Sequence, residues 1–135
     1  MTTTATATDI IASARALATV VRAGADATEA GRQLDPGVFR ALSEARMFDL
    51  VLPQALGGLE VDITTMMRVI EEVSIADGAT GWCVGIGVGT SVVSGTLPDS
   101  VAREIFAPGV VTGGPVAPMG RATPVDGGYR VTGRW

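Results

Sequence analysis

The stretch LDPGVFRALSEARMFDLVLPQALGGLE, residues 34–60, carries a strong signal for helical structure. Asp35 followed by Pro36 is typical of a helix start, because the carboxylate accepts hydrogen bonds from the first N–H groups and proline needs no donor there. Pro53 and the pair Gly57-Gly58 then break the regular spacing, so we expect a loop that redirects the chain. The helix between these signals would bury one face, made of Val38, Leu42, Ala45 and Met47.

Apolar residues recur at helical spacing on both sides of this stretch. Before it, one helix is predicted with an apolar face of Ile10, Ile11, Ala14, Leu17, Ala18 and Val21, followed by a polar segment at residues 24–34. After it, Asp62 can cap a helix whose buried stripe would be Ile63, Met66, Met67, Ile70 and Val73. The sequence LPDSVAREIFAPG, residues 97–109, predicts a further short helix.

Residues 79–98 contain no charged side chain and are long enough to cross a bilayer. They also contain several glycines and hydroxyl residues and lack flanking basic residues, which is not typical of a membrane span. We expect a buried helix instead. Gly81, Gly85 and Gly89 are spaced by four, so they would form a smooth seam that another helix can approach closely.

The composition excludes several kinds of chemistry. The net charge is -4, and the ten basic residues, all arginines, form no stripe, so nucleic-acid binding is not expected. The chain has no lysine and no histidine, which excludes a Schiff-base lysine, a histidine base and a histidine-ligated metal within it. One cysteine gives no disulfide framework, and the amino-terminal residues lack the parts of a signal peptide, so we expect a cytoplasmic location.

From residue 110 onward, Gly, Pro, Val and Thr replace the helical spacing. Asp126-Gly127 is a hairpin turn signal, and Tyr129, Val131, Gly133 and Trp135 alternate with polar residues as in a half-buried strand. A second region of β type is therefore predicted, and the chain ends inside it.

Single residues that could carry chemistry have plainer interpretations. Cys83 lies in an apolar run and is interpreted as a small buried residue, because nothing nearby in sequence would lower its pKa. Glu71 and Glu72 are adjacent on a helix and therefore point in different directions, so they form no acid–base pair. Arg121, Arg130 and Arg134 could face a phosphate, but solvated charges on a sheet edge are the favoured interpretation.

Three stretches together resemble the amino-terminal part of the acyl-CoA dehydrogenase superfamily. They are residues 34–60, quoted above, VIEEVSIADGATGW at residues 69–82, and GGYRVTGRW at residues 127–135. The resemblance implies a mainly α fold with a helical domain at residues 9–108, after a disordered start at residues 1–8. Residues 109–135 would be the truncated beginning of a β-barrel-like middle domain, so we expect residues 1–135 alone to be inactive.

The resemblance also implies a flavin cofactor, FMN or FAD. Dehydrogenases of the family usually carry a Thr-Glu-Pro stretch and a Gly-Ser-Asp triplet, where this chain has TGGPVAPMGRA at residues 112–122. PMGRATPVDGGYRVTGRW, residues 118–135, looks more like the branch of monooxygenases that receive reduced flavin from a separate reductase. The favoured function is hydroxylation of a small organic substrate, and the alternative within the family is desaturation of an acyl-CoA.

The resemblance assigns few site residues. Thr112, Gly113, Gly114 and Pro115 match the segment that runs beside the flavin, and Trp135 matches an aromatic residue next to it. Trp82, Ser91 and Ser94 correspond to the wall of the substrate pocket. No catalytic residue and no metal ligand is assigned within the chain, and a homo-oligomer, a tetramer or a dimer, is expected for the full-length family.

A hypothesis of another class is that the chain is a non-catalytic helical interaction module. The unpaired strand end and the glycine seam both favour association with another protein. A protein that stays colourless with added flavin but forms stable oligomers would support this alternative.

Overall fold

The computed structural model of the chain describes residues 6–114, 117 and 119–134. The helices are α1 (Ala7–Ala16), α2 (Ala18–Gly31), α3 (Pro36–Glu44), α4 (Ile63–Ala76), α5 (Gly78–Ser91) and α6 (Asp99–Ile105). Short 3-10 turns, η1 (Gln54–Leu56) and η2 (Val92–Thr96), follow α3 and α5. Strands β1 (Gly120–Val125) and β2 (Gly128–Gly133) form an antiparallel hairpin. The mainly α fold class predicted from the sequence is confirmed.

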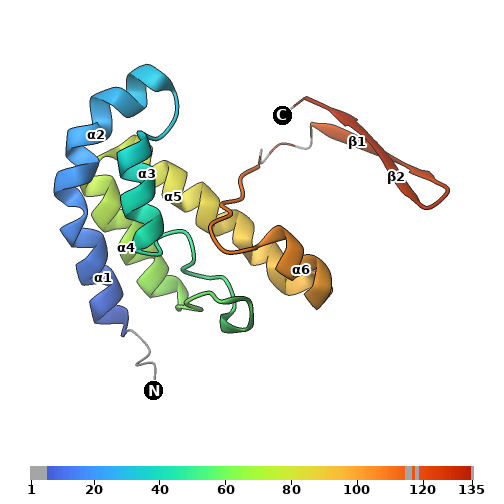
Figure 1. Cartoon of the computed structure of the whole chain (residues 1–135), viewed down its shortest axis with the longest axis horizontal. Coiled ribbons are helices and arrows are strands. Elements are labelled where there is room, and N and C mark those ends of the chain that lie inside the picture. Colours follow the sequence, from blue (N-terminus) through green and yellow to red (C-terminus); the bar gives the residue numbers. More distant parts are fainter. Residues whose placement is uncertain (1–5, 115–116, 118, 135) are drawn as a thin grey trace.

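The helices pack into one body, and α4 contacts α1, α2 and α5. In Figure 1, α1 and α2 follow each other along one side, and α3 lies in front of the pair formed by α4 and α5. The core between them is almost entirely aliphatic, as expected from a chain with 4% aromatic residues. Its most buried large side chains are Leu42, Met47, Leu50, Val21, Val38, Val69, Val73, Val84 and Val88.

Aspartate side chains cap the N-termini of three helices. The Asp35 carboxylate accepts hydrogen bonds from the backbone N–H groups of Gly37 and Val38, at 2.8 and 3.2 Å. Asp62 accepts from the Thr65 N–H at 3.0 Å, and Asp77 accepts from the Thr80 N–H at 2.7 Å. Each carboxylate satisfies donors that have no partner inside the helix, so the starts of α3, α4 and α5 are set locally.

The first predicted helix is in fact two helices that meet at Leu17, and α2 continues through most of the predicted polar segment. Gly24 lets α3 lie close to this part of α2, because a Cβ added there would come within 2.4 Å of Val38 Cγ2. The charged residues of this part of α2 face outward, whereas Thr28 is buried and its hydroxyl accepts a hydrogen bond from the Asp35 N–H at 3.0 Å. The helix ends where Arg32 adopts a left-handed conformation, at φ 51°.

The predicted buried stripe of α4 is wrong for two residues. Ile63 and Met67 are 67% and 55% exposed, whereas Thr65, Val69 and Val73 are buried. The helix is turned so that this second row faces its neighbours, and Thr65 can enter the core because its hydroxyl donates to the Asp62 carboxylate at 2.6 Å.

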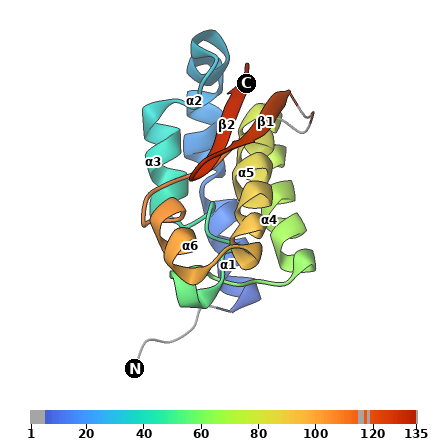
Figure 2. The same ribbon diagram turned by 90° about the vertical axis from the view of Figure 1, so that its right-hand side faces the viewer.

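The hairpin turn at Asp126-Gly127 is confirmed, with Val125 paired to Gly128. The prediction of a half-buried strand is wrong, because Tyr129 and Val131 are 70% and 60% exposed. Figure 1 and Figure 2 show the reason: the hairpin stands outside the helical body, and no helix covers either of its faces.

The glycine seam of α5 makes a close contact at its first position only. A Cβ on Gly81 would come within 2.0 Å of Ser74 Oγ and 2.8 Å of Ser74 Cα, on α4. At Gly85 the nearest atom would be Ile70 Cδ1, at 3.9 Å, and at Gly89 nothing lies within 4 Å. Gly81 therefore sets the distance between α4 and α5. None of the helices in the described part of the chain is long and apolar enough to cross a membrane.

This geometry predicts opposite effects for one substitution at two glycines of α5. Gly81→Ala should lower the free energy of unfolding by about 1–3 kcal/mol, because the backbone of α4 has to move. Gly89→Ala should raise it by about 0.5–1 kcal/mol, because alanine restricts the unfolded chain and meets no neighbour. Urea denaturation of both variants measures the difference, and equal effects at the two positions would contradict the close approach.

Candidate functional site

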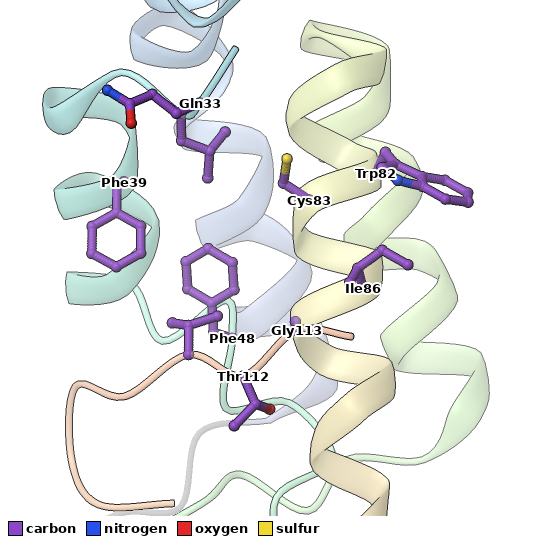
Figure 3. A pocket seen from close by; sticks show the side chains of 11 residues that line it. Gln33, Phe39, Phe48, Trp82, Cys83, Ile86, Thr112 and Gly113 are labelled. Carbon is purple, nitrogen blue, oxygen red and sulfur yellow. The ribbon is translucent and has the colours of Figure 1, made fainter. Parts of the chain in front are cut away.

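An open cavity of about 580 Å³ lies where α3, α5 and the segment after α6 meet. Three parts of the chain line it, and Figure 3 shows them around α5. The first part comprises Gln33, Leu34, Phe39 and Phe48, the second Trp82, Cys83, Ile86 and Gly87 of α5, and the third Val111, Thr112 and Gly113.

The two phenylalanines form one side of this cavity. Phe39 is placed by the capped start of α3, and Phe48 follows the buried anchor Met47. Their ring centroids are 5.7 Å apart and the rings are tilted by 34°, an arrangement that aromatic pairs favour. Phe48 is buried whereas Phe39 is 39% exposed, so the pair extends from the core to the opening of the cavity.

The segment after α6 forms the floor of the cavity by packing on α5. Gly87 makes room for it: a Cβ there would lie 3.0 Å from both Phe48 Cδ1 and Val111 Cγ1. One turn later, the Thr90 hydroxyl lies 2.8 Å from the carbonyl oxygen of Thr112. Residues 111 and 112 are therefore held against the helix by one apolar and one polar contact.

None of the side chains that line the cavity is charged at neutral pH, and the Cys83 thiol is the one among them that can ionise. Burial raises the pKa of this thiol above its ordinary value, and the negative charge of Asp77 raises the same pKa further. The raised pKa disfavours the reactive thiolate, as expected from the sequence, but Cys83 is half-buried at the cavity rather than fully buried. The described part of the chain also contains no group of acidic, cysteine or histidine residues suited to a metal ion.

The structure brings together several of the site residues predicted from the sequence. Trp82, Thr112 and Gly113 line the cavity, and Gly114 follows them in an exposed position. In Figure 3 the Trp82 ring lies on the side of α5 away from the phenylalanines, and it is 70% exposed. Pro115 and Trp135 lie outside the described residues.

Ser91 and Ser94 are placed differently, because neither lines this cavity. Both are buried, at 4% exposure, and the Ser91 hydroxyl donates to the Val88 carbonyl at 2.7 Å. Their assignment to a substrate pocket stays a prediction.

Sequence reasoning missed Phe39, Phe48 and Thr90. A signal existed for the phenylalanines, because the chain has only three Phe, two Trp and one Tyr, and aromatic side chains supply large apolar contact surfaces. No local signal existed for Thr90, whose partner lies 22 residues away.

Comparison with known proteins identifies the helical body. Residues 4–104 match the family model described as "Acyl-CoA dehydrogenase, N-terminal domain". This match covers most of the chain, so the chain belongs to the acyl-CoA dehydrogenase family, and its helices form the amino-terminal domain of that family.

Several relatives are oxygenases. The chain is 35% identical over 118 residues to the "Flavin-dependent monooxygenase, oxygenase subunit HsaA" of Mycobacterium tuberculosis, which covers 85% of this chain and 30% of that protein. It is 29% identical to the "FADH(2)-dependent resorcinol hydroxylase, oxygenase component" of a Rhizobium species, over 88% of this chain and 30% of that protein.

The solved structure of XiaF from a Streptomyces species, in complex with FADH2 and glycerol, superposes with a TM-score of 0.88. Its identity to this chain is 28%, over 94% of this chain and 33% of that one. The chain thus spans about a third of the length of the relatives it matches.

The surroundings of Cys83 predict how fast its thiol is alkylated. Asp77→Asn should increase the rate of reaction with iodoacetamide at pH 8, on the order of twofold, because removing the negative charge lowers the thiol pKa and raises the thiolate fraction. Asparagine also caps helices well, so α5 should keep its start. The matched control is Asp99→Asn at the start of α6, outside the hollow that Cys83 and Asp77 line together, and it should leave the rate unchanged. The rate is measured by mass spectrometry. An unchanged rate in Asp77→Asn would show that Asp77 does not raise the pKa of the Cys83 thiol.

Proposed function

We propose that this chain forms one wall of the active site in the oxygenase component of a flavin-dependent monooxygenase that hydroxylates a small organic substrate. The observation that carries the proposal is the open, apolar cavity with the backbone of Gly113 at its floor, followed by the exposed Gly114. The names of the relatives support the same reaction, and two of them specify FADH2, so we propose reduced FAD as the cofactor rather than FMN.

The residues present fit a flat, aromatic cofactor beside this backbone. A Cβ on Gly113 would meet only Ile86 Cγ2, at 3.9 Å, and one on Gly114 would meet nothing within 4 Å. The backbone at both positions is therefore open to close approach by a ring system. Thr112, Gly113 and Gly114 would hold the flavin from this side, with Pro115 and Trp135 as further predicted contacts.

When bound, reduced flavin supplies the electrons that activate molecular oxygen. The contribution of this chain is to position the ring through the backbone of residues 112–114 and to keep water away through the lining side chains. The pair of Phe39 and Phe48 offers a flat apolar surface suited to an uncharged substrate. The Trp82 ring points away from these phenylalanines, so its assignment to the wall of the substrate pocket stays a prediction.

Two further features belong to the proposal. The words "oxygenase component" and "oxygenase subunit" in the names of the relatives support a separate flavin reductase as partner. A cytoplasmic location fits the single cysteine, because proteins of oxidising compartments more often rely on disulfides. The expected homo-oligomer, a dimer or a tetramer, stays part of the proposal.

The test uses the full-length natural protein that contains residues 1–135. Anaerobic titration should show tighter binding of FADH2 than of oxidised FAD. With a reductase, NADH and a panel of small aromatic compounds, one product should carry a single oxygen atom from ¹⁸O₂, read by mass spectrometry. Residues 1–135 alone should give no product, because they supply only one wall of the site.

The alternatives predict different results in the same measurements. An acyl-CoA dehydrogenase would bind oxidised FAD tightly, lose its yellow colour on addition of an acyl-CoA, and incorporate no oxygen. A helical interaction module would bind neither form of flavin and would form stable oligomers. Either pattern would refute the monooxygenase proposal.

A further inference from the structure

The Thr90 hydroxyl joins the end of α5 to the segment that floors the cavity. Its Oγ1 atom lies 2.8 Å from the carbonyl oxygen of Thr112 and 2.8 Å from Thr112 Oγ1. It also lies 3.1 Å from the carbonyl oxygens of Ile86 and Gly87, in its own helix. The two shortest contacts of this hydroxyl are thus made with a residue 22 positions later in the chain.

The hydroxyl groups of Thr90 and Thr112 have one proton each, which limits the hydrogen bonds they can donate. A threonine hydroxyl donates one hydrogen bond and accepts others. The Thr112 hydroxyl can donate to Thr90 Oγ1, which leaves the Thr90 proton for the Thr112 carbonyl at the shorter distance. This assignment satisfies both hydroxyl groups and the carbonyl at once, in a half-buried position.

The bond to the Thr112 carbonyl also orients the next amide. The peptide bond between Thr112 and Gly113 is trans, so its C=O and N–H groups point in opposite directions. Because the carbonyl faces Thr90 on α5, the Gly113 N–H is turned away from Thr90. Because this N–H group points away from α5, it is available to a ligand that lies beside residues 112–114.

The apolar contact next to Thr90 cannot replace this function. Val111 packs over Gly87, which fixes how close the segment comes to α5. Packing of one side chain leaves the following peptide plane free to rotate, whereas a hydrogen bond to its carbonyl sets that rotation. Gly87 therefore sets the distance of the segment from α5, and Thr90 sets the direction of its amide.

We propose that Thr90 is a positioning residue for the flavin: through the Thr112 carbonyl it aims the Gly113 N–H at the cofactor. This inference rests on the proposed function, because it assigns the flavin as the acceptor of that N–H. Thr90 itself does not line the cavity and acts only through the backbone of residues 112 and 113. Figure 3 shows Thr112 and Gly113 beside α5 at the lower end of the cavity.

The experiment compares the full protein with Thr90→Val and Thr90→Ser. Valine keeps the shape of the side chain and removes the hydroxyl, whereas serine keeps the hydroxyl. The matched control is Thr96→Val, which removes an exposed hydroxyl that donates only to the nearby Val93 carbonyl, at 2.8 Å. Two quantities are measured: the protection from hydrogen–deuterium exchange that saturating FADH2 gives to the amides of residues 112–114, and the anaerobic dissociation constant for FADH2.

In Thr90→Val, FADH2 should protect the amides of residues 112–114 less than in the wild type, and it should bind about five- to tenfold more weakly, as expected for the loss of one hydrogen bond. Thr90→Ser and Thr96→Val should behave as the wild type in both measurements. Wild-type protection by FADH2 and wild-type affinity in Thr90→Val would overturn the inference, and so would a Thr90→Ser variant as impaired as Thr90→Val, because packing would then explain the effect.

The comparison of the wild type with Thr90→Val separates this inference from the proposed function. If the wild type binds FADH2 and Thr90→Val binds it equally well, the positioning role fails while the proposed function stands. If the wild type binds no flavin in either redox state, the proposed function fails, and the role assigned to Thr90 fails with it, because the Gly113 N–H then has no flavin to meet.

Discussion

The close approach of α4 and α5 at Gly81 is the constraint on which both the core and the cavity depend. Ser74 occupies the space that a side chain at this position would need, so the two helices come together nearly backbone to backbone. This contact lets Val84 and Val88 reach the centre of the helical body, where both are fully buried. One side of α5 is thereby fixed within the core, and its other side is free to form the cavity.

The two functions of α5 explain its low content of large side chains. Toward the cavity it presents Cys83 and Gly87, which are small enough to leave room for the phenylalanines and for Val111. A helix made of glycine and small residues is intrinsically weak, because glycine loses more conformational freedom on folding than other residues. Packing on both sides has to compensate, which links the stability of this helix to the presence of the segment at residues 111–113.

Local chemistry made part of the fold predictable. The caps at Asp35 and Asp62 and the turn at Asp126-Gly127 use interactions within a few residues, and all three are confirmed. The buried face of α4 was not predictable in this way. Hydrophobicity alone ranks Ile63 and Met67 above Thr65, but the burial depends on where α1, α2 and α5 lie and on a hydroxyl that finds its acceptor.

The same difference between local and distant interactions applies to the candidate site. Trp82, Thr112 and Gly113 were identified through motifs of the family, whereas Phe39 and Thr90 depend on contacts between parts of the chain far apart in sequence. The contact of Thr90 illustrates why: a threonine near the end of an apolar helix is ordinarily explained by a bond to its own helix carbonyls, and both such carbonyls are present at 3.1 Å. Only the position of Thr112, which is set by the packing of Val111 on Gly87, turns this ordinary residue into a link between the helical core and the backbone that faces the cavity.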